Sequence, residues 1–184
     1  MGWPVLETDR LALTLPPVAA AERVAAFYER NRAHHAPWSP IPPDGFYTEE
    51  YWRAQLQQNR EEFEEGASMR LFLFARDDLD GAVLGGCNFT NIVRGPFLSC
   101  HLGYQLDEAA VGKGLMQEAL GVALPYVFDE LGLHRVAANY MPVNERSGRL
   151  LRRMGFVVEG YARDYLCIAG EWRDHVLTAR YADA

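Results

Sequence analysis

Cysteine is scarce in this sequence of 184 residues, and the three that occur, Cys87, Cys100 and Cys167, are widely spaced. Their odd number and spacing exclude a disulfide framework and do not match the ligand pattern of a zinc site. We expect all three to be small apolar residues buried in strands. Free thiols of this kind fit a reducing compartment, so a cytoplasmic location is expected.

Long hydrophobic runs are also missing, so the sequence offers no candidate membrane span. The opening Met1-Gly2-Trp3-Pro4 lacks the pattern of a secretory signal peptide. No stretch has the composition of a linker, a low-complexity segment or an internal repeat. A chain of this length is expected to bury one core, and we predict a single domain over residues 1–184.

Positive charge is in deficit, because 25 acidic residues face 18 Lys and Arg and the formal net charge is −7. Sequence-independent nucleic-acid binding needs a basic surface, so nucleic acid is not an expected partner. A basic protein partner stays open, since opposite charges steer encounter. The run Glu61, Glu62, Glu64 and Glu65 could attract such a partner, although acidic runs are more often solvated helix faces.

Hydrophobic periodicity and turn residues predict the order β-α-α-β-β-β-α-β-α-β-β. Strands are expected at residues 6–15, 69–75, 82–92, 99–106, 134–140, 157–168 and 171–180. Helices are expected at residues 18–32, 49–65, 112–131 and 144–154, and a proline-rich loop at 36–47. This order is typical of an α/β (α+β) domain with a mixed, mostly antiparallel sheet.

Helix punctuation is clear at several points. Thr48 and Asn144 are expected N-caps, and Gly155 is expected just beyond the end of the last helix. Pro125 conflicts with the helix around it, because proline removes a backbone hydrogen bond at a cost of about 3 kcal/mol. We expect a kink or an early break there.

The segment with the most chemical content joins a strand to a helix through glycines. Leu102-Gly103-Tyr104-Gln105-Leu106 precedes the turn Val111-Gly112-Lys113-Gly114-Leu115-Met116. Glycine lets backbone N–H groups approach a ligand, and the start of a helix attracts anions. A pyrophosphate is the ligand that this arrangement suits best, although a flexible helix start without a ligand explains the glycines equally well.

A second segment, Asn144-Glu145-Arg146-Ser147 followed by Gly155-Phe156, places Ser147 in the first turn of a capped helix. On residue type alone, the better interpretation is a hydroxyl that bonds to the local backbone.

Taken together, these segments resemble the GNAT superfamily of N-acetyltransferases. Shared words across nearly the whole chain resemble its RimJ branch, a ribosomal-protein-alanine N-acetyltransferase whose sister branches include RimL. These words are Thr8-Asp9-Arg10-Leu11, Pro37-Trp38, Asn91-Ile92-Val93-Arg94-Gly95, Leu102-Gly103-Tyr104, Gly112-Lys113-Gly114-Leu115-Met116, Ala138-Asn139-Tyr140-Met141-Pro142, Arg146-Ser147-Gly148 and Trp172-Arg173-Asp174-His175-Val176.

The resemblance implies a GNAT acyl-CoA N-acyltransferase fold, with helices on both faces of the sheet and a splay between the fourth and fifth strands. Acetyl-CoA would be the co-substrate, and no metal would be needed. Its pantetheine arm would pair with the backbone of Tyr104, Gln105 and Leu106, and residues 111–116 would hold the pyrophosphate. Asn139 and Asn144 would hold the pantetheine side, and Ser147 would approach the sulfur as a candidate general acid.

Two positions depart from the family pattern. Val111 stands where the pyrophosphate motif usually opens with Gln or Arg, which matters little if backbone N–H groups make the contacts. His101 stands where relatives often have a glutamate. We therefore rank His101 first as general base, since histidine titrates near neutrality, with Glu159 and Asp164 behind it. A half-buried strand histidine without chemistry is nearly as good an interpretation.

The acceptor groove is expected beside the proline-rich loop, lined by Trp38, Phe46 and Tyr47 with Asp164 nearby. Trp52 fits ordinary packing better. The pair His34-His35 lacks partner ligands at metal-binding spacing, so we expect no metal site.

Three functions follow from these observations. The first is acetyl transfer to the N-terminal amine of a ribosomal protein, by direct attack in a ternary complex. The second is the same chemistry on a small amine, such as an amino acid, a polyamine, an antibiotic or an aminoacyl nucleotide, and the third is an acetyl-CoA-binding module without turnover. An open groove between residues 36–47 and the Ala169-Gly170 hairpin would favour a peptide, and a closed pocket would favour a metabolite. A monomer and a homodimer are both compatible with the family.

Overall fold

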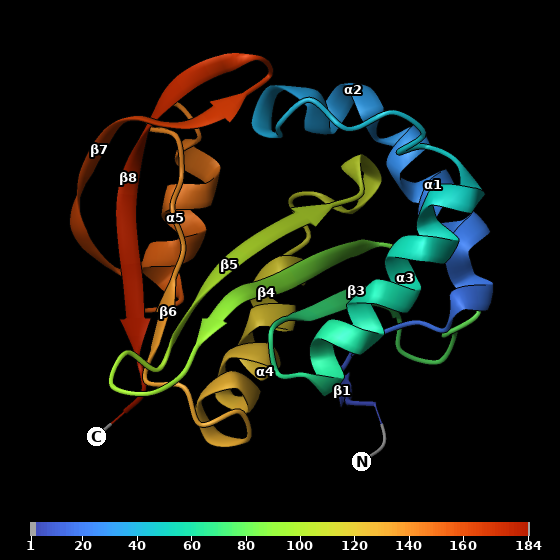
Figure 1. Cartoon of the computed structure of the whole chain (residues 1–184), viewed down its shortest axis with the longest axis horizontal. Helices are drawn as coiled ribbons and strands as arrows, with labels where there is room; N and C mark the ends of the chain where they lie inside the picture. The colour runs from blue at the N-terminus through green and yellow to red at the C-terminus, as the bar shows by residue number, and fades with distance from the viewer. Residues whose placement is uncertain (1–2, 184) are drawn as a thin grey trace.

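The computed structural model describes residues 3–183. Within that range eight strands form one sheet in the order β1-β2-β3-β4-β5-β6-β8-β7, and the β5–β6 pair alone runs parallel (Figure 1). The strands are Val5–Glu7, Leu11–Thr14, Met69–Ala75, Gly85–Val93, Ser99–Leu106, Arg135–Ala137, Val157–Ile168 and Glu171–Tyr181, numbered β1 to β8 along the chain. The predicted fold class, a mixed and mostly antiparallel sheet with helices, is confirmed.

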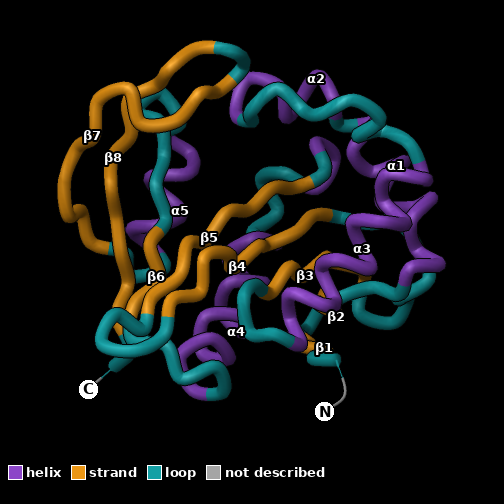
Figure 2. The backbone as a smooth tube through the Cα atoms, viewed as in Figure 1, coloured by secondary structure: helices purple, strands orange, loops and turns teal. Residues whose placement is uncertain are grey.

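Helices cover both faces of the sheet because the strand residues alternate between two apolar sets. Leu71 and Leu73 of β3 pack with α4 (Leu115–Asp129) and α5 (Glu145–Arg153) in one buried cluster. Phe72 and Phe74 pack on the other face with α1 (Ala21–Arg30) and α3 (Glu49–Glu64). The short helix α2 (Arg32–His35) follows α1 along the chain (Figure 2).

The predicted splay lies between β5 and β6. The two strands pair only from Ser99↔Arg135 to His101↔Ala137, and β5 then continues to Leu106 paired with β4 but not with β6. The chain after β6 turns instead to β8, where the Ala138 N–H donates to the Thr178 carbonyl at 2.9 Å. The strands therefore part just beyond His101.

The first predicted strand, residues 6–15, is wrong as a single strand. It is a hairpin, β1 and β2, that reverses at Thr8-Asp9-Arg10, where the Thr8 N–H donates to the Leu11 carbonyl at 2.9 Å. The first predicted helix, residues 18–32, is also divided. A 3₁₀ turn at Val18–Ala20 precedes α1, and the chain bends at Asn31 before α2 begins.

Of the two outcomes expected at Pro125, the early break is wrong, since α4 continues to Asp129, and the kink stays a prediction. The carbonyl left without a partner is that of Gly121, four residues earlier. Gly121 and Pro125 are both exposed, so solvent can bond to this carbonyl. Pro125 therefore lies on the solvent-exposed side of the helix.

Two of the three cysteines, Cys87 and Cys100, are buried in strands as predicted, and burial raises the pKa of each thiol to about 12. Cys167 is exposed on β7, so the prediction is wrong there. No helix within residues 3–183 combines the length and the apolar character needed to cross a bilayer.

Candidate active site

The glycine-bearing turn before α4 has an open backbone. Gly112 and Gly114 adopt positive φ values of 80° and 76°, a conformation that favours glycine. Gly114 is the N-cap, and the first intrahelical bond runs from the Glu118 N–H to its carbonyl at 3.1 Å. The N–H groups of residues 115–117 therefore begin the helix without an intrahelical acceptor, which is the arrangement that binds anions.

Ser147 lies where the parted strands meet α5. Its Oγ is 2.7 Å from the Tyr104 hydroxyl on β5, and either oxygen can be the donor. Burial is the main cause that raises the pKa of Tyr104 to about 12, so the phenol stays protonated at neutral pH. The pair thus presents a proton donor beside the splay.

The position of Ser147 is fixed by the start of α5. Asn144 is the N-cap, as predicted, and its Oδ1 accepts the Ser147 N–H at 3.2 Å. Gly148 lies directly against the ring of Tyr140, because a Cβ there would stand 2.7 Å from Tyr140 Cε2. A larger residue at position 148 would require the Tyr140 ring to shift.

Asn139 ties the chain after β6 to β7 and β8. Its Oδ1 accepts the Thr178 N–H at 3.2 Å, and its Nδ2 donates to the Tyr165 hydroxyl at 3.0 Å. Its predicted contact with pantetheine stays a prediction.

The opposite face of β5 carries a different set of groups. Cys100 and Leu102 belong to the core beneath α4, so His101, Gly103 and Gln105 face the α1–α3 side. Gln105 Nε2 donates to the Tyr28 hydroxyl of α1 at 2.5 Å. A Cβ on exposed Gly103 would meet no atom within 4 Å, so the sheet face is open there.

His101 is the last β5 residue that pairs with β6 and faces this open surface. Among residues 3–183, its buried Nδ1 finds no hydrogen-bond partner. Burial, and then the charge of Arg135, lower the pKa of the imidazole below 6.5, so the ring is neutral at pH 7. A neutral imidazole can accept a proton, but the unpaired Nδ1 is buried, so a proton from an acceptor would have to arrive at Nε2.

Of the other two base candidates, Glu159 has an engaged carboxylate and Asp164 makes a backbone hydrogen bond. Glu159 forms an ion pair with Arg135 and accepts the Tyr181 hydroxyl, and these hydrogen bonds lower the pKa of its carboxyl. Arg135 pairs with Ser99, at the closed end of β5–β6. The exposed Asp164 has a φ of 47° on β7 and donates its N–H to Asp174 Oδ1 at 2.9 Å. His101 is the candidate nearest the splay.

The predicted acceptor residues fall into two environments. Trp38 is 39% exposed, whereas Phe46 packs edge-on against Tyr28 with ring centroids 4.9 Å apart. Trp52 is 5% exposed and donates its Nε1–H to the Phe46 carbonyl, which confirms packing as its role. Tyr47 lies under the Arg32 guanidinium and lines, with Phe46, a hollow of about 390 Å³.

The proline-rich loop and the β7–β8 hairpin touch at one point. The Ala169 N–H donates to the Ser39 carbonyl at 3.0 Å, and a Cβ on Gly170 would stand 3.2 Å from Ile41 Cδ1. We call this contact the bridge (Figure 2). The proline-rich loop therefore contacts the tip of the hairpin directly. The two arrangements considered from the sequence, an open groove and a closed pocket, stay predictions.

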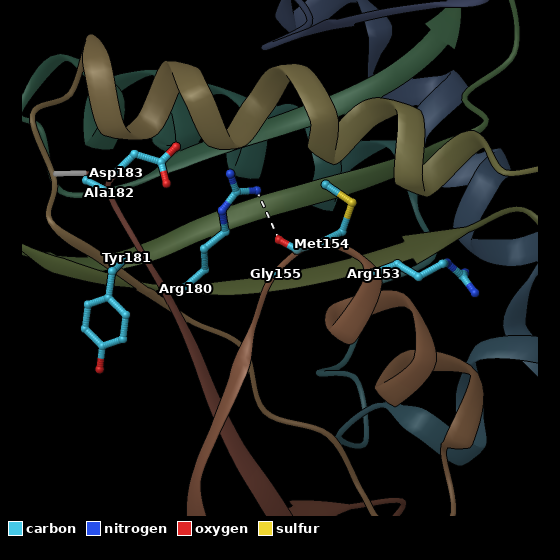
Figure 3. Close-up of a pocket in the computed structure, with 7 residues that line it drawn as sticks. All are labelled: Arg153, Met154, Gly155, Arg180, Tyr181, Ala182 and Asp183. Carbon is cyan, nitrogen blue, oxygen red and sulfur yellow. Dashed lines mark hydrogen bonds between the residues drawn. The ribbon is translucent and has the colours of Figure 1, made fainter.

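A second hollow, of about 550 Å³, lies away from these groups, at the end of α5 and of β8. Figure 3 shows Arg180 there, with its Nη1 donating to the Met154 carbonyl at 3.0 Å. Its lining residues include none of the predicted site residues.

Sequence patterns did not reveal how distant residues pair across the site. The Tyr104–Ser147 contact spans 43 positions and the Tyr28–Gln105 contact spans 77. Periodicity reports only neighbours along one element, so neither contact leaves a local signal. The resemblance of Leu102-Gly103-Tyr104 to a motif of the family indicated Tyr104, but only as a backbone partner of the pantetheine arm.

Comparison with known families agrees with this geometry. The model of the acetyltransferase (GNAT) domain matches residues 10–157. The chain is 45% identical over 174 residues to the [ribosomal protein uS5]-alanine N-acetyltransferase of Escherichia coli, which covers 95% of this chain and 89% of that protein.

Solved structures give the same result. A ribosomal-protein-S5-alanine acetyltransferase from Vibrio fischeri superposes with a TM-score of 0.93 at 35% identity, covering 98% of this chain and 97% of that one. RimJ from Mycobacterium smegmatis, in complex with CoA-disulfide, superposes with a TM-score of 0.87 at 25% identity, covering 98% and 87% of the two chains.

Proposed function

Because this chain belongs to the acetyltransferase (GNAT) domain family, we propose that it transfers the acetyl group of acetyl-CoA to the N-terminal α-amine of a ribosomal protein. The alanine of protein uS5, named for the Escherichia coli relative, is the first acceptor to test. One observation carries the proposal. Ser147 and Tyr104 lie on one face of the parted strands and His101 on the other, so a thioester in the splay would meet both sets.

The co-substrate would enter from the α4–α5 side. The pantetheine arm would pair with β5 at Tyr104, Gln105 and Leu106, which lose their β6 partner beyond His101. The Leu106 carbonyl lies 2.8 Å from His35 Nε2, so the arm would share or displace that contact. The pyrophosphate would lie on the N–H groups of residues 112–117, and Asn139 and Asn144 would flank the arm. A side chain at residue 111 is not required for these backbone contacts.

The reaction is direct attack within a ternary complex. The neutral amine forms a bond to the thioester carbon, its proton passes to His101, and the C–S bond then breaks. An α-amine has a pKa of about 7.7–8.0, so a useful fraction is already neutral near pH 7. The leaving thiolate takes a proton from the hydroxyl pair of Ser147 and Tyr104. Solvent returns that proton to the pair and takes up the proton held by His101, which restores the starting state.

The acceptor would approach from the α1–α3 side, beneath the bridge. The open surface at Gly103 lies next to His101, and Trp38, Phe46, Tyr47 and Asp164 surround the approach in the sequence-based proposal. We propose a cytoplasmic enzyme, since its acceptor would be a ribosomal protein, acting as a monomer or a homodimer.

A small amine is the second candidate acceptor, and the bridge is the observation that favours it, because two segments that contact each other leave less room between them for a long acceptor. An acetyl-CoA-binding module without turnover is the remaining alternative. The presence of Asn144 and Ser147 at the start of α5 argues against that alternative.

Thiol release separates the three candidates. Purified protein is incubated with acetyl-CoA and either a peptide carrying the N-terminus of the host's uS5, the same peptide with a blocked amine, or a panel of small amines. We expect free coenzyme A and an acetylated peptide only with the free N-terminus. Thiol release with small amines alone would contradict the ribosomal acceptor, and binding without any release would contradict the enzyme. Mass spectrometry of the host's ribosomal proteins, with and without this gene, identifies the natural acceptor.

A further inference from the structure

The turn between β1 and β2 is hydrogen-bonded to the first turns of α4. The Thr8 hydroxyl donates to Glu118 Oε1 at 2.5 Å, and the Arg10 backbone N–H donates to the same oxygen at 2.9 Å. Arg10 Nε donates to Glu118 Oε2 at 2.7 Å. One carboxylate thus joins two segments that lie more than a hundred residues apart in the sequence.

Arg10 also reaches the glycine-bearing turn itself. Its Nη1 donates to the Lys113 carbonyl at 3.0 Å, and its Nη2 lies 3.8 Å from the point where a Cβ on Gly114 would stand. The guanidinium therefore lies along the end of the turn.

The beginning of the same segment is held from α1. Asp107 Oδ2 accepts Arg30 Nε at 2.6 Å and Asn31 Nδ2 at 3.0 Å. Asn31 Oδ1 accepts the Glu108 N–H at 2.8 Å, and Asn31 is only 1% exposed. Residues 107–114 are thus held at both ends by side chains from the first 31 residues of the chain.

Holding residues 107–114 in one shape affects how tightly the turn can bind a ligand. Gly112 and Gly114 have more backbone freedom than other residues, and no side chain caps the start of α4. A free turn would lose this freedom when it binds a ligand, and that loss weakens affinity. A turn already held in shape avoids the loss.

We propose that Arg10 and Asn31 are positioning residues that hold residues 107–114 in the shape that binds the pyrophosphate of acetyl-CoA. This inference rests on the proposed function. Arg10 acts through geometry rather than charge, because Glu118 neutralises it and the guanidinium bonds to a carbonyl of the turn.

The test compares Arg10→Ala, Arg10→Lys and Asn31→Ser with the unmodified protein. Calorimetric titration gives the Kd for coenzyme A, and steady-state kinetics with the peptide acceptor give KM and kcat. We expect Kd for coenzyme A and KM for acetyl-CoA to rise about tenfold in all three variants. The kcat at saturating acetyl-CoA should stay within about twofold, since no proton-transfer group changes.

Arg76→Ala is the matched control, because the Arg76 side chain pairs with Glu7 of the same hairpin at 3.7 Å and not with residues 107–114. The backbone N–H of residue 76, which donates to the Arg10 carbonyl at 3.0 Å, is kept by alanine. It should bind coenzyme A like the unmodified protein. Thermal unfolding without ligand identifies any variant that does not fold. Arg10 is half exposed, so its two variants keep the test decisive if the buried Asn31 variant fails to fold.

Coenzyme A affinity equal to that of the unmodified protein in the Arg10 variants would overturn the inference. Full affinity in Arg10→Lys with weak binding in Arg10→Ala would also overturn it, because charge alone would then suffice. If the unmodified protein does not bind coenzyme A, the proposed function fails instead.

Discussion

Ser147 and His101 occupy opposite faces of the sheet because side chains alternate along β5. Tyr104, which contacts Ser147, points to the α5 side, whereas His101 points to the α1 side. Ser147 and His101 were both identified from the sequence. Their positions on opposite faces of the sheet were not predicted, because alternation assigns a side chain to a face only when the core side of the strand is known.

Replacing Ser147 with Ala is expected to lower kcat by about a hundredfold, the lower end of the range for general acid catalysis. The Kd for coenzyme A should change by no more than about threefold, since residues 112–117 are untouched. Tyr104→Phe is the companion variant, because it removes the other hydroxyl of the pair. The variant with the larger loss identifies the residue that protonates the thiolate, and full kcat in both would remove the pair from the mechanism.

Replacing His101 with Gln is expected to change the pH dependence of kcat/KM. The acceptor amine, with a pKa of about 7.7–8.0, gives one proton-dependent limb on the acidic side. His101 must be neutral to act, and its pKa lies below 6.5, so a second limb should appear below pH 6.5 in the unmodified enzyme. His101→Gln should lose the second limb and about a hundredfold in kcat/KM at pH 7.

The exposed His134 supplies the control for this profile, and His134→Gln should keep both limbs. A second limb that persists in His101→Gln would assign the proton to another group.

At the scale of elements, local signals predicted helix ends better than strand ends. Asn144 and Thr48 cap α5 and α3 as expected, because a cap is set by one side chain and the next turn. The reversal at Thr8-Asp9-Arg10 was missed, since the alternation of β1 continues into β2 without a glycine or a proline between them. The contacts with Glu118 that stabilise this turn come from a distant helix.

Two helical glycines should respond oppositely to alanine. Gly121 is exposed, and a Cβ there meets no atom within 4 Å, so Gly121→Ala should raise the free energy of unfolding by about 0.5–1 kcal/mol. In Gly148→Ala the Cβ would collide with the Tyr140 ring, and overpacking should lower the free energy of unfolding by about 1–2 kcal/mol.

Urea unfolding at fixed pH measures both changes. In a protein that carries Tyr140→Ala, the ring that collides with residue 148 is absent. Adding Gly148→Ala to that variant should therefore no longer lower its free energy of unfolding. Equal effects of alanine at the two glycines would contradict the packing argument.

At the scale of the whole molecule, the order of elements and the position of the splay were predicted, and eight strands are present because the first predicted strand is a hairpin. The bridge was not predicted. It joins Ser39 and Ala169, which lie 130 positions apart, through backbone groups. The side chains at these positions do not make the contact, so the sequence gives no signal for it.

Stability should fall as the pH drops from 6.5 towards 5. Burial lowers the pKa of His35 and of His101 in the folded state, so the unfolded chain binds protons first. The free energy of unfolding is therefore highest above pH 6.5 and decreases as the pH falls through the folded-state values. Thermal midpoints at pH 7.5 and 5.5 measure this change, which should be smaller in the double variant His35→Gln, His101→Gln. An equal change in the double variant would contradict the assignment.

The contact between Ser39 and Ala169 also has a mechanical consequence. It links the proline-rich loop to the tip of the β7–β8 hairpin, two segments that lie next to each other in Figure 1. Because only backbone groups make this hydrogen bond, most side-chain substitutions at the two positions would leave it in place, whereas proline at residue 169 would remove the donor. Any movement of one segment away from the other would have to break it.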